Sequence, residues 1–325
     1  MRWISGIMAG TLVACAPVTQ DSVAPPDGRD GDSVDNIASP AEDEAAARFD
    51  WKQNFPGWYA AVEPFQIMGT GRKGIYFVGT EGLGIYFIPT DVGHIVIDSG
   101  MPGEGQYVAD AIRKLGFDPG DVKILLNSHA HLDHSGGLAE LKAMTGAKLV
   151  ASEGDRSALE GGFYLGSEDD STMNAPPVKV DRTIGNGEQL KLGDVTLTAH
   201  ITPGHSRGCT TWTMPVVQGG ETYEALIFCS ATVAANRLVG PPQYEGIVED
   251  YRKTFAMTKD WQPDIFLANH PEFAGLPDKR ARQKAGDPLA FVDREGFPAL
   301  MARLEKAFEA ELEKQMLKYN AIMSD

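Results

Sequence analysis

Three histidines and one aspartate fall within six residues of this chain, directly after a short hydrophobic run. The run, Lys123 to Asn127, is compact and apolar, which predicts a buried strand. The segment that follows is Ser128-His129-Ala130-His131-Leu132-Asp133-His134-Ser135-Gly136-Gly137. A loop leaving the end of a strand can turn all four side chains into one cavity. Imidazole nitrogen and carboxylate oxygen are the donors that zinc and similar ions accept, so this loop predicts a metal site.

The alternative for this segment is a solvated, histidine-rich loop that binds no metal. The whole chain has only 7 histidines, and chance would rarely place three of them this way. We therefore favour the metal site. Gly136 and Gly137 are expected to let the backbone turn sharply before the next helix.

Remote donors should complete the site, because four ligands from one loop cannot fill two metal positions. His205 lies in a turn-rich segment after a predicted strand that ends near His200. His270 follows the last predicted strand. Taken alone, each is more often a capped or core histidine, but beside the first cluster both become candidate ligands. His94 and His200 are interpreted as structural.

The hydrophobic pattern predicts two blocks of strands, each followed by helices. This order favours two β-sheets packed together with helices on the outside. The C-terminal segment is a helix with Phe297, Leu300, Met301, Leu304, Phe308 and Leu312 on one stripe. The expected strands are Ile75–Val78, Gly84–Ile88, His94–Asp98, Lys123–Asn127, Lys148–Ala151, a hairpin over Gln189–His200, Thr210–Val217, Glu224–Cys229 and Asp264–Ala268. The expected internal helices are Gln106–Leu115, Leu138–Met144 and Val248–Trp261.

The N-terminus predicts export. Residues 1–15 have the outline of a secretory signal, and Leu12-Val13-Ala14-Cys15 resembles a lipoprotein cleavage box. Lipidated Cys15 would anchor the protein to the outer membrane, facing the periplasm; an ordinary signal peptide with a chance cysteine is the alternative. Residues 16–50 have almost no large apolar side chains and predict a flexible tether. Residues 51–325 are expected to form a single domain.

The charge balance excludes several partners. The formal net charge is −16, which argues against nucleic acid, whose phosphates need a basic surface. It equally argues against polybasic attachment to anionic lipid. Any membrane contact is therefore expected through the lipid anchor alone.

The two remaining cysteines, Cys209 and Cys229, would reach an oxidising compartment. Each lies in or beside a predicted strand. A disulfide and two buried thiols both remain open at this point, since spacing does not decide between them.

The pattern His-x-His-x-Asp-His with two later histidines resembles the metallo-β-lactamase superfamily, and more narrowly its subclass B3. The similarity runs over residues 55–320 and includes Tyr76 to Leu83 and Thr202 to His205. It implies an α/β fold, a four-layer αβ/βα sandwich of two mixed β-sheets with helices outside. It also implies two Zn²⁺ ions: one on His129, His131 and His205, the other on Asp133, His134 and His270.

The same resemblance assigns roles to residues around the metals. Asp98 matches a buried carboxylate that orients ligands behind the metal loop. Ser230 and Thr232 match positions that contact the substrate carboxylate. Many superfamily hydrolases, among them glyoxalase II and the acyl-homoserine lactonases, carry a metal-bridging aspartate near Cys229, and this chain has none. A disulfide or a buried thiol is favoured for Cys229 over zinc ligation.

The implied activity is hydrolysis of the β-lactam ring of antibiotics, giving resistance. Zinc lowers the pKa of a water that attacks the ring carbonyl, and Asp133 orients that water. Two alternatives stay open: a related hydrolase of lactones or thioesters, and a non-catalytic periplasmic zinc-binding lipoprotein. A β-CASP-type nuclease is set aside, because the acidic charge would repel its substrate. We expect a monomer that takes a small-molecule substrate, with loops 160–175 and 234–245 setting its range.

Overall fold

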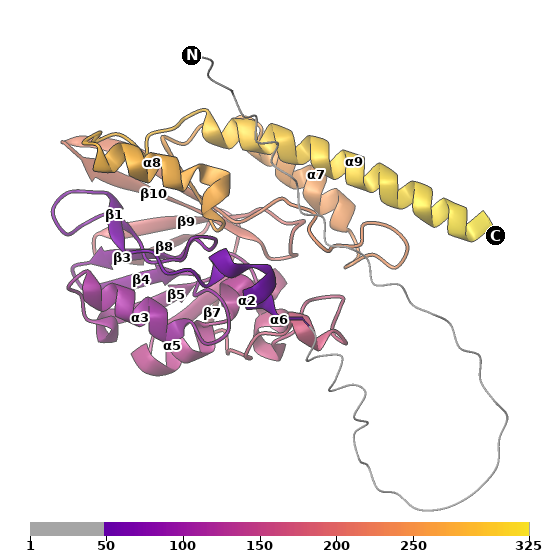
Figure 1. Ribbon diagram of the computed structural model, residues 1–325, viewed down its shortest axis with the longest axis horizontal. Coiled ribbons are helices and arrows are strands. Elements are labelled where there is room, and N and C mark those ends of the chain that lie inside the picture. Colours follow the sequence, from indigo (N-terminus) through magenta and orange to yellow (C-terminus); the bar gives the residue numbers. More distant parts are fainter. Residues whose placement is uncertain (1–48, 325) are drawn as a thin grey trace, which may run out of the picture.

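Two β-sheets lie face to face in the computed structural model, with helices on both outer surfaces (Figure 1). The structure describes residues 49–324; the predicted signal segment, Cys15 and nearly all of the tether lie outside them. The first sheet contains β1 (Phe65–Met68), β2 (Ile75–Phe77), β3 (Tyr86–Thr90), β4 (Gly93–Ile97), β5 (Val122–Leu126), β6 (Lys148–Ser152) and β7 (Arg182–Ile184), in that order. The second contains β12 (Ile265–Ala268), β11 (Glu221–Phe228), β10 (Thr210–Gln218), β9 (Val195–Ile201) and β8 (Gln189–Leu192), in that order.

Both sheets are mixed, as predicted. Strands β1 to β4 pair antiparallel and β4 to β7 pair parallel. In the second sheet only β11 and β12 are parallel. The metal-binding candidates follow three strand ends: His129 to His134 come after β5, His205 comes after β9, and His270 comes after β12.

Helices cover the outer faces and complete the four layers (Figure 1). Helices α3 and α5 cover the first sheet, and α7 and α9 pack against the second. The bounds of the helices are α2 (Trp51–Asn54), α3 (Gly105–Lys114), α4 (Leu132–Ser135), α5 (Leu138–Thr145), α6 (Glu153–Gly161), α7 (Ile247–Thr258), α8 (Leu276–Lys284) and α9 (Gly296–Ser324). Short 3-10 turns are Pro56–Trp58, Pro119–Asp121, Ser171–Met173 and Pro271–Ala274.

The period-2 alternation of strand side chains builds three hydrophobic layers. Ile95 and Ile97 of β4 point into the core between the sheets, whereas Val96 points outward under α3 and α5. In β11, Ile227 points into the same central core, and Phe228 packs outward against α7 and α9. Each sheet therefore has two buried faces.

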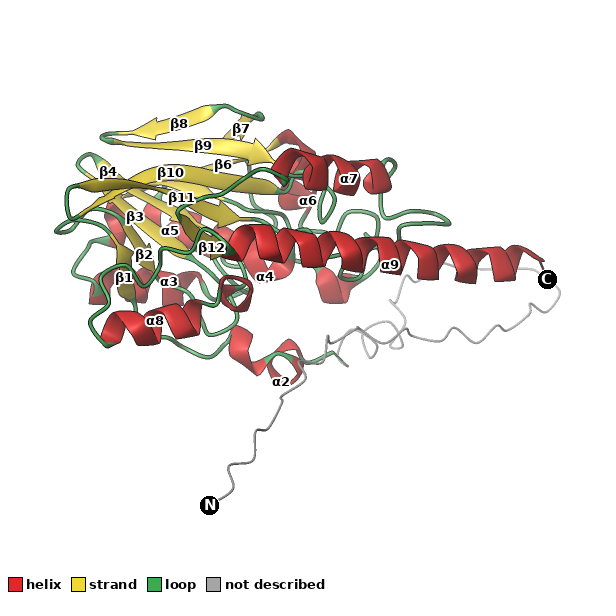
Figure 2. Ribbon diagram, turned by 90° about the horizontal axis from the view of Figure 1, so that it is seen from above, coloured by secondary structure: helices red, strands yellow, loops and turns green. Residues whose placement is uncertain are grey.

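The predicted C-terminal helix is confirmed as α9, which runs along the second sheet and extends beyond it (Figure 2). Five residues of its predicted stripe are buried, and Leu304 is partly buried against the same cluster. No helix among residues 49–324 is long and apolar enough to cross a membrane.

Six helices and strands escaped the sequence pattern: β1, β7, α2, α4, α6 and α8. Helices α2 and α4 span only 4 residues each. Strands β1 and β7 are only 4 and 3 residues long, too short for a clear alternation. Helix α8 is strongly charged and buries only Leu276 and Lys279. Helix α6 carries a glycine in its first turn, and only Asp155, Ala158 and Leu159 are buried.

Candidate metal centre

His129, His131 and His205 form one group of converging nitrogen donors, here called the three-histidine group. Their ligand atoms lie within 4.8 Å of one another. The Nε2 atoms of His129 and His205 are 3.1 Å apart. The ring of His131 lies 4.4 Å from that of His129 and 4.6 Å from that of His205, centroid to centroid. The strand ends of β5 and β9, in different sheets, bring these residues together.

Asp133, His134 and His270 form a second, adjacent group, here called the aspartate group. Asp133 Oδ2 lies 3.1 Å from His134 Nε2 and 3.4 Å from His270 Nε2. The two Nε2 atoms are 3.2 Å apart. His129 joins the groups, because its ligand atom also lies within 4.8 Å of those of Asp133 and His134. The structure thus brings all six predicted ligands into one centre.

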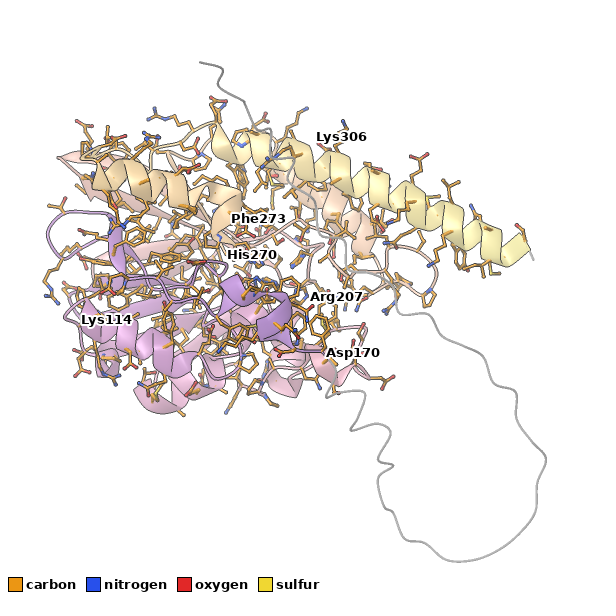
Figure 3. All side chains as sticks on the ribbon, viewed as in Figure 1. Lys114, Asp170, Arg207, His270, Phe273 and Lys306 are labelled. Carbon is orange, nitrogen blue, oxygen red and sulfur yellow. A yellow bond between two sulfur atoms is a disulfide. The ribbon has the colours of Figure 1, made fainter. Side chains whose placement is uncertain are left out.

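Backbone carbonyls hold two of the imidazoles from behind. His205 Nδ1 lies 2.8 Å from the carbonyl of Thr232, and His270 Nδ1 lies 3.0 Å from the carbonyl of Gly82. A carbonyl can only accept, so each Nδ1 carries the proton and each Nε2 offers a lone pair to the centre. Figure 3 shows His270 beside Phe273, near the middle of the molecule.

Asp98 supports the metal loop from the end of β4. Its Oδ1 accepts bonds from the backbone N of Ser128 at 2.6 Å and from Asn127 Nδ2 at 3.1 Å. Its Oδ2 accepts the Ser128 hydroxyl at 2.6 Å and faces His134 Nδ1 at 3.5 Å. Asp98 adopts a left-handed φ of 63°, a conformation that costs free energy outside glycine and clusters at functional sites.

The glycines after the loop have another purpose than the predicted one. Gly136 and Gly137 have φ values of −58° and −86°, so neither uses a conformation reserved for glycine. A Cβ on Gly136 would instead lie 2.3 Å from Pro102 N, and one on Gly137 would lie 2.5 Å from Ser99 O. The predicted turn is present between α4 and α5, but it does not use the conformational freedom of glycine. The small residues allow the segment after β4 to pack closely on the metal loop.

Burial keeps the three-histidine group neutral at physiological pH. Burial lowers the pKa of His129 and His131 well below the usual range, and neighbouring imidazoles lower it further. Burial likewise lowers the pKa of His205 to about 4, although the Thr232 carbonyl opposes the shift. Neutral imidazole is the form that binds a metal.

Asp133 stays ionised despite its burial. Burial raises its pKa, but His134 and His270 outweigh that effect and hold the pKa well below the usual range. Burial lowers the pKa of His134, and Asp133 and Asp98 more than compensate, raising it to about 10.

This donor set fits divalent transition metals. Five imidazoles and one carboxylate match the N/O sites that such ions prefer. Facing Nε2 lone pairs, as in His129 and His205, repel one another unless a proton or a metal lies between them. Burial disfavours the charged imidazolium, and the converging donor atoms fit a metal ion.

Ser230 and Thr232 lie directly beside the three-histidine group. Their hydroxyl oxygens are 3.2 Å apart, and Thr232 Oγ1 lies 3.2 Å from His205 Nδ1. Ser230 is buried and Thr232 is partly exposed. The two hydroxyls can therefore act together on a group that approaches the histidines.

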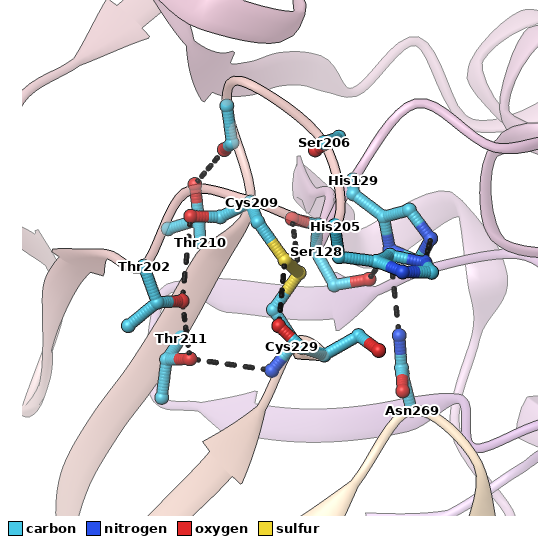
Figure 4. Close-up of a disulfide and its surroundings, with 12 residues drawn as sticks. Ser128, His129, Thr202, His205, Ser206, Cys209, Thr210, Thr211, Cys229 and Asn269 are labelled. Carbon is cyan, nitrogen blue, oxygen red and sulfur yellow. Dashed lines mark hydrogen bonds between the residues drawn. A yellow bond between two sulfur atoms is a disulfide. The ribbon is translucent and has the colours of Figure 1, made fainter. Parts of the chain in front are cut away.

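A disulfide joins Cys209 to Cys229 beneath the centre (Figure 4). It links the segment after His205 to the segment before Ser230. The backbone carbonyl of Ser128 accepts from Thr210 N at 2.8 Å, so the metal loop contacts the same region. The disulfide occupies the end of β11, leaving no carboxylate or thiolate there for a metal.

Residues 85–217 match the metallo-beta-lactamase superfamily. Among solved structures, the subclass B3 metallo-beta-lactamase BJP-1 of Bradyrhizobium japonicum is 48% identical over 81% of this chain and 98% of that chain, with a TM-score of 0.78. This chain belongs to the metallo-β-lactamase superfamily. The metallo-beta-lactamase FEZ-1 of Legionella gormanii is 36% identical over 79% of this chain and 98% of that chain, with a TM-score of 0.75. The predicted fold and the predicted likeness to subclass B3 are confirmed.

Curated relatives of this superfamily member include other hydrolases. A hydroxyacylglutathione hydrolase of Rhodospirillum rubrum is 30% identical over 33% of this chain and 34% of its own length. The N-acyl homoserine lactonase AttM of Rhizobium radiobacter is 34% identical over 32% of this chain and 40% of its own length. The chain thus spans well under half of these curated relatives. These matches support metal-dependent hydrolysis in general and do not single out one substrate.

Three polar residues near the ligands of this metallo-β-lactamase centre were not predicted. Tyr164 stacks on the ring of His131 at 4.3 Å, and its hydroxyl lies 2.9 Å from Asn236 Oδ1. Asn236 Nδ2 donates to the carbonyl of His205 at 2.9 Å. Asn269 Nδ2 lies 3.4 Å from His129 Nδ1. Tyr164 and Asn236 lie in loops 160–175 and 234–245, which were expected to set the substrate range. That expectation is the sequence signal that could have identified these two residues.

An aromatic cluster packs against the aspartate group. The ring of Trp58 lies 5.9 Å from that of His270, and Phe55 stacks on Trp58 at 4.3 Å. Trp51 Nε1 donates to the carbonyl of Thr172 at 2.9 Å. The first described segment therefore connects the aspartate group with loop 160–175.

The two histidines interpreted as structural lie away from the six donors. His94 packs edge-on between Phe87 and Phe117. His200 Nε2 lies 2.9 Å from Thr213 Oγ1, and its ring packs against Trp261. Burial lowers the pKa of both imidazoles.

Proposed function

We propose that this protein is a zinc-dependent β-lactamase that hydrolyses penicillins, cephalosporins or carbapenems and so confers resistance. In this proposal one zinc binds the three-histidine group and a second binds the aspartate group. The observation that carries it is the pair of hydroxyls, Ser230 and Thr232, beside the three-histidine group and just after Cys229, near which many other superfamily hydrolases carry a metal-bridging aspartate. β-Lactam antibiotics carry a carboxylate that such hydroxyls can bind.

Zinc, when bound, supplies a Lewis acid and lowers the pKa of water, so that hydroxide is available at neutral pH. The residues of the chain position the attacking water and the substrate. The ionised Asp133 accepts a hydrogen bond from the attacking water and aims it at the ring carbonyl. Thr232 donates its hydroxyl to the substrate carboxylate, and Ser230, 3.2 Å away, holds that hydroxyl in place. Ser230 is a binding group in this scheme and not a nucleophile.

The location follows the sequence expectation. We propose that the chain is exported to the periplasm, anchored to the outer membrane through lipidated Cys15, and acts there as a monomer on a small-molecule substrate. Antibiotics that act on the cell wall cross this compartment, so hydrolysis there would protect the cell.

The test is hydrolysis of a carbapenem and a cephalosporin by purified protein lacking residues 1–15. Rates would be measured as isolated, after chelation and after zinc is restored. We expect turnover that disappears with chelator and returns with zinc. Stoichiometric zinc binding without lactam cleavage would contradict the proposal.

A second candidate is hydrolysis of lactones or thioesters, favoured by the similarity to AttM and to the hydroxyacylglutathione hydrolase. The same assays with an acyl-homoserine lactone and a glutathione thioester would distinguish it. A non-catalytic periplasmic zinc-binding lipoprotein would show tight metal binding and no turnover on any of these substrates.

A further inference from the structure

Asp155, in the first turn of α6, accepts three hydrogen bonds from two separate loops. Its Oδ2 accepts from the backbone N of Ala130 at 3.0 Å and from the Ser206 hydroxyl at 2.8 Å. Its Oδ1 accepts from the backbone N of Gly208 at 2.8 Å. The side chain is buried, with the whole residue only 2% exposed.

The partners of Asp155 are the chain neighbours of the three-histidine group. Ala130 lies between His129 and His131, and Ser206 directly follows His205. One carboxylate thus connects the two loops that carry all three imidazoles, while it contacts none of the imidazoles itself.

The backbones around this carboxylate are in close contact. A Cβ on Gly208 would lie 2.4 Å from Asp155 N, and one on Gly154 would lie 2.8 Å from the carbonyl of Arg207. The Ser152 hydroxyl donates to the Gly208 carbonyl at 2.6 Å. The start of α6 and the loop after His205 therefore form one rigid unit, from which Asp155 reaches the metal loop.

The chemistry of the site requires a carboxylate. All three partners are donors: two backbone N–H groups and one hydroxyl. An amide would offer one oxygen and turn an NH₂ group toward a donor, and an apolar side chain would leave the donors unpaired.

We infer that Asp155 is a positioning residue that sets the spacing of the three-histidine group by holding the metal loop against the loop of His205. The inference rests on the proposed metal centre and deepens it. Asp98 supports the metal loop from the first sheet and lies beside the aspartate group. Asp155 instead bonds Ala130, Ser206 and Gly208, which lie beside the three histidines in the chain.

The experiment compares metal binding by wild type and Asp155→Asn, using zinc and cobalt(II) titrations of the metal-free protein. Cobalt absorption reports the geometry of each site. We expect one binding step to weaken about 10- to 100-fold, with an altered cobalt spectrum for that step. The other step, at the aspartate group, should change by no more than about twofold.

Asp264→Asn is the matched control. Asp264 accepts from Glu224 N at 2.9 Å and pairs with Arg294, so it joins β11 to other segments without touching either ligand loop. It should leave both binding steps unchanged. If Asp155→Asn does not fold, Ser206→Ala serves instead: it removes one of the three bonds and should weaken the same step about fivefold.

Two results would overturn the inference: unchanged binding in Asp155→Asn, or equal weakening of both steps with a lowered melting temperature, which marks a purely structural residue. A wild type that binds metal but cleaves no lactam would defeat the proposed function and leave this test intact. A wild type that binds no metal would overturn both.

Discussion

His129 Nε2 and His205 Nε2 lie 3.1 Å apart although 76 residues separate them in the sequence. His129 follows a strand of the first sheet, and His205 follows a strand of the second. Only the packing of the two sheets brings these atoms together. The geometry of the centre therefore depends on the packing of the whole fold. Substitutions of its ligands should weaken metal binding more than they lower the free energy of unfolding.

Replacing His205 should reduce metal binding at the three-histidine group. His205→Ala removes one of three nitrogen donors and leaves the aspartate group complete. We expect bound zinc to fall by about one ion per chain, and kcat/KM for a hydrolysed lactam to fall at least about 100-fold. Elemental analysis and steady-state kinetics check both. His200→Ala is the control, because His200 contacts Thr213 and Trp261 and none of the six candidate ligands is changed. This variant should retain all of its zinc.

Replacing Asp98 should weaken metal binding without disturbing the backbone. Asparagine tolerates the left-handed conformation at this position, but its amide cannot accept all the bonds that the carboxylate accepts. Asp98→Asn should therefore lower zinc affinity about 10- to 100-fold. Competition with a chromophoric chelator measures it. An unchanged affinity would show that the three bonds from Asn127 and Ser128 do not orient the ligands.

Thr232 should affect substrate binding more than the chemical step. In Thr232→Val the backbone carbonyl still accepts from His205, but the hydroxyl is lost. We expect KM for a carboxylated lactam to rise about tenfold or more, with a much smaller change in kcat. Thr232→Ser keeps the hydroxyl and should restore KM to near the wild-type value. A fall in kcat alone would argue against a carboxylate contact.

The disulfide should stabilise the fold by restricting the unfolded chain. Cys209 and Cys229 are 20 residues apart, and closing a loop of that length contributes about 3 kcal/mol. The double variant Cys209→Ala, Cys229→Ala should lose about that much free energy of unfolding in urea denaturation. A reducing agent should lower the stability of the wild type and leave the variant unaffected. Equal stability of both proteins would contradict the bond.

Glu104 should make stability depend on pH. Burial raises the pKa of Glu104 from 4.5 to about 7, although a bond from Met101 N opposes the shift. The folded protein therefore binds more protons than the unfolded chain between these values. The free energy of unfolding should fall as the pH rises through this window and level off above it.

Glu104→Gln removes that dependence. Between pH 4.5 and 7 the free energy of unfolding of the wild type should fall by up to about 3 kcal/mol relative to that of the variant. Both proteins are measured without metal, and the titrations that they share cancel in the difference. A constant difference across this range would rule out a raised pKa at Glu104.

Much of this protein could be predicted from local patterns. The apolar stripe of α9 predicts its buried face, because apolar residues that recur at helical spacing lie on the side of the helix that packs against the core. The clustering of histidines around Asp133 predicts a metal centre, because those donor types have few other uses in such a pattern. Strands β1 and β7 escaped notice, because three or four residues carry too little periodicity.

Local sequence by itself thus determined the type of most strands and longer helices, the candidate metal-binding donors and the likeness to subclass B3. Only the tertiary structure decided which loops meet. It placed Asp155 of α6 against both ligand loops, and it required Gly136 and Gly137 to be small for packing rather than for turning. The physical reason is that hydrogen bonds and close contacts between loops depend on how the sheets stack. No local pattern records that stacking.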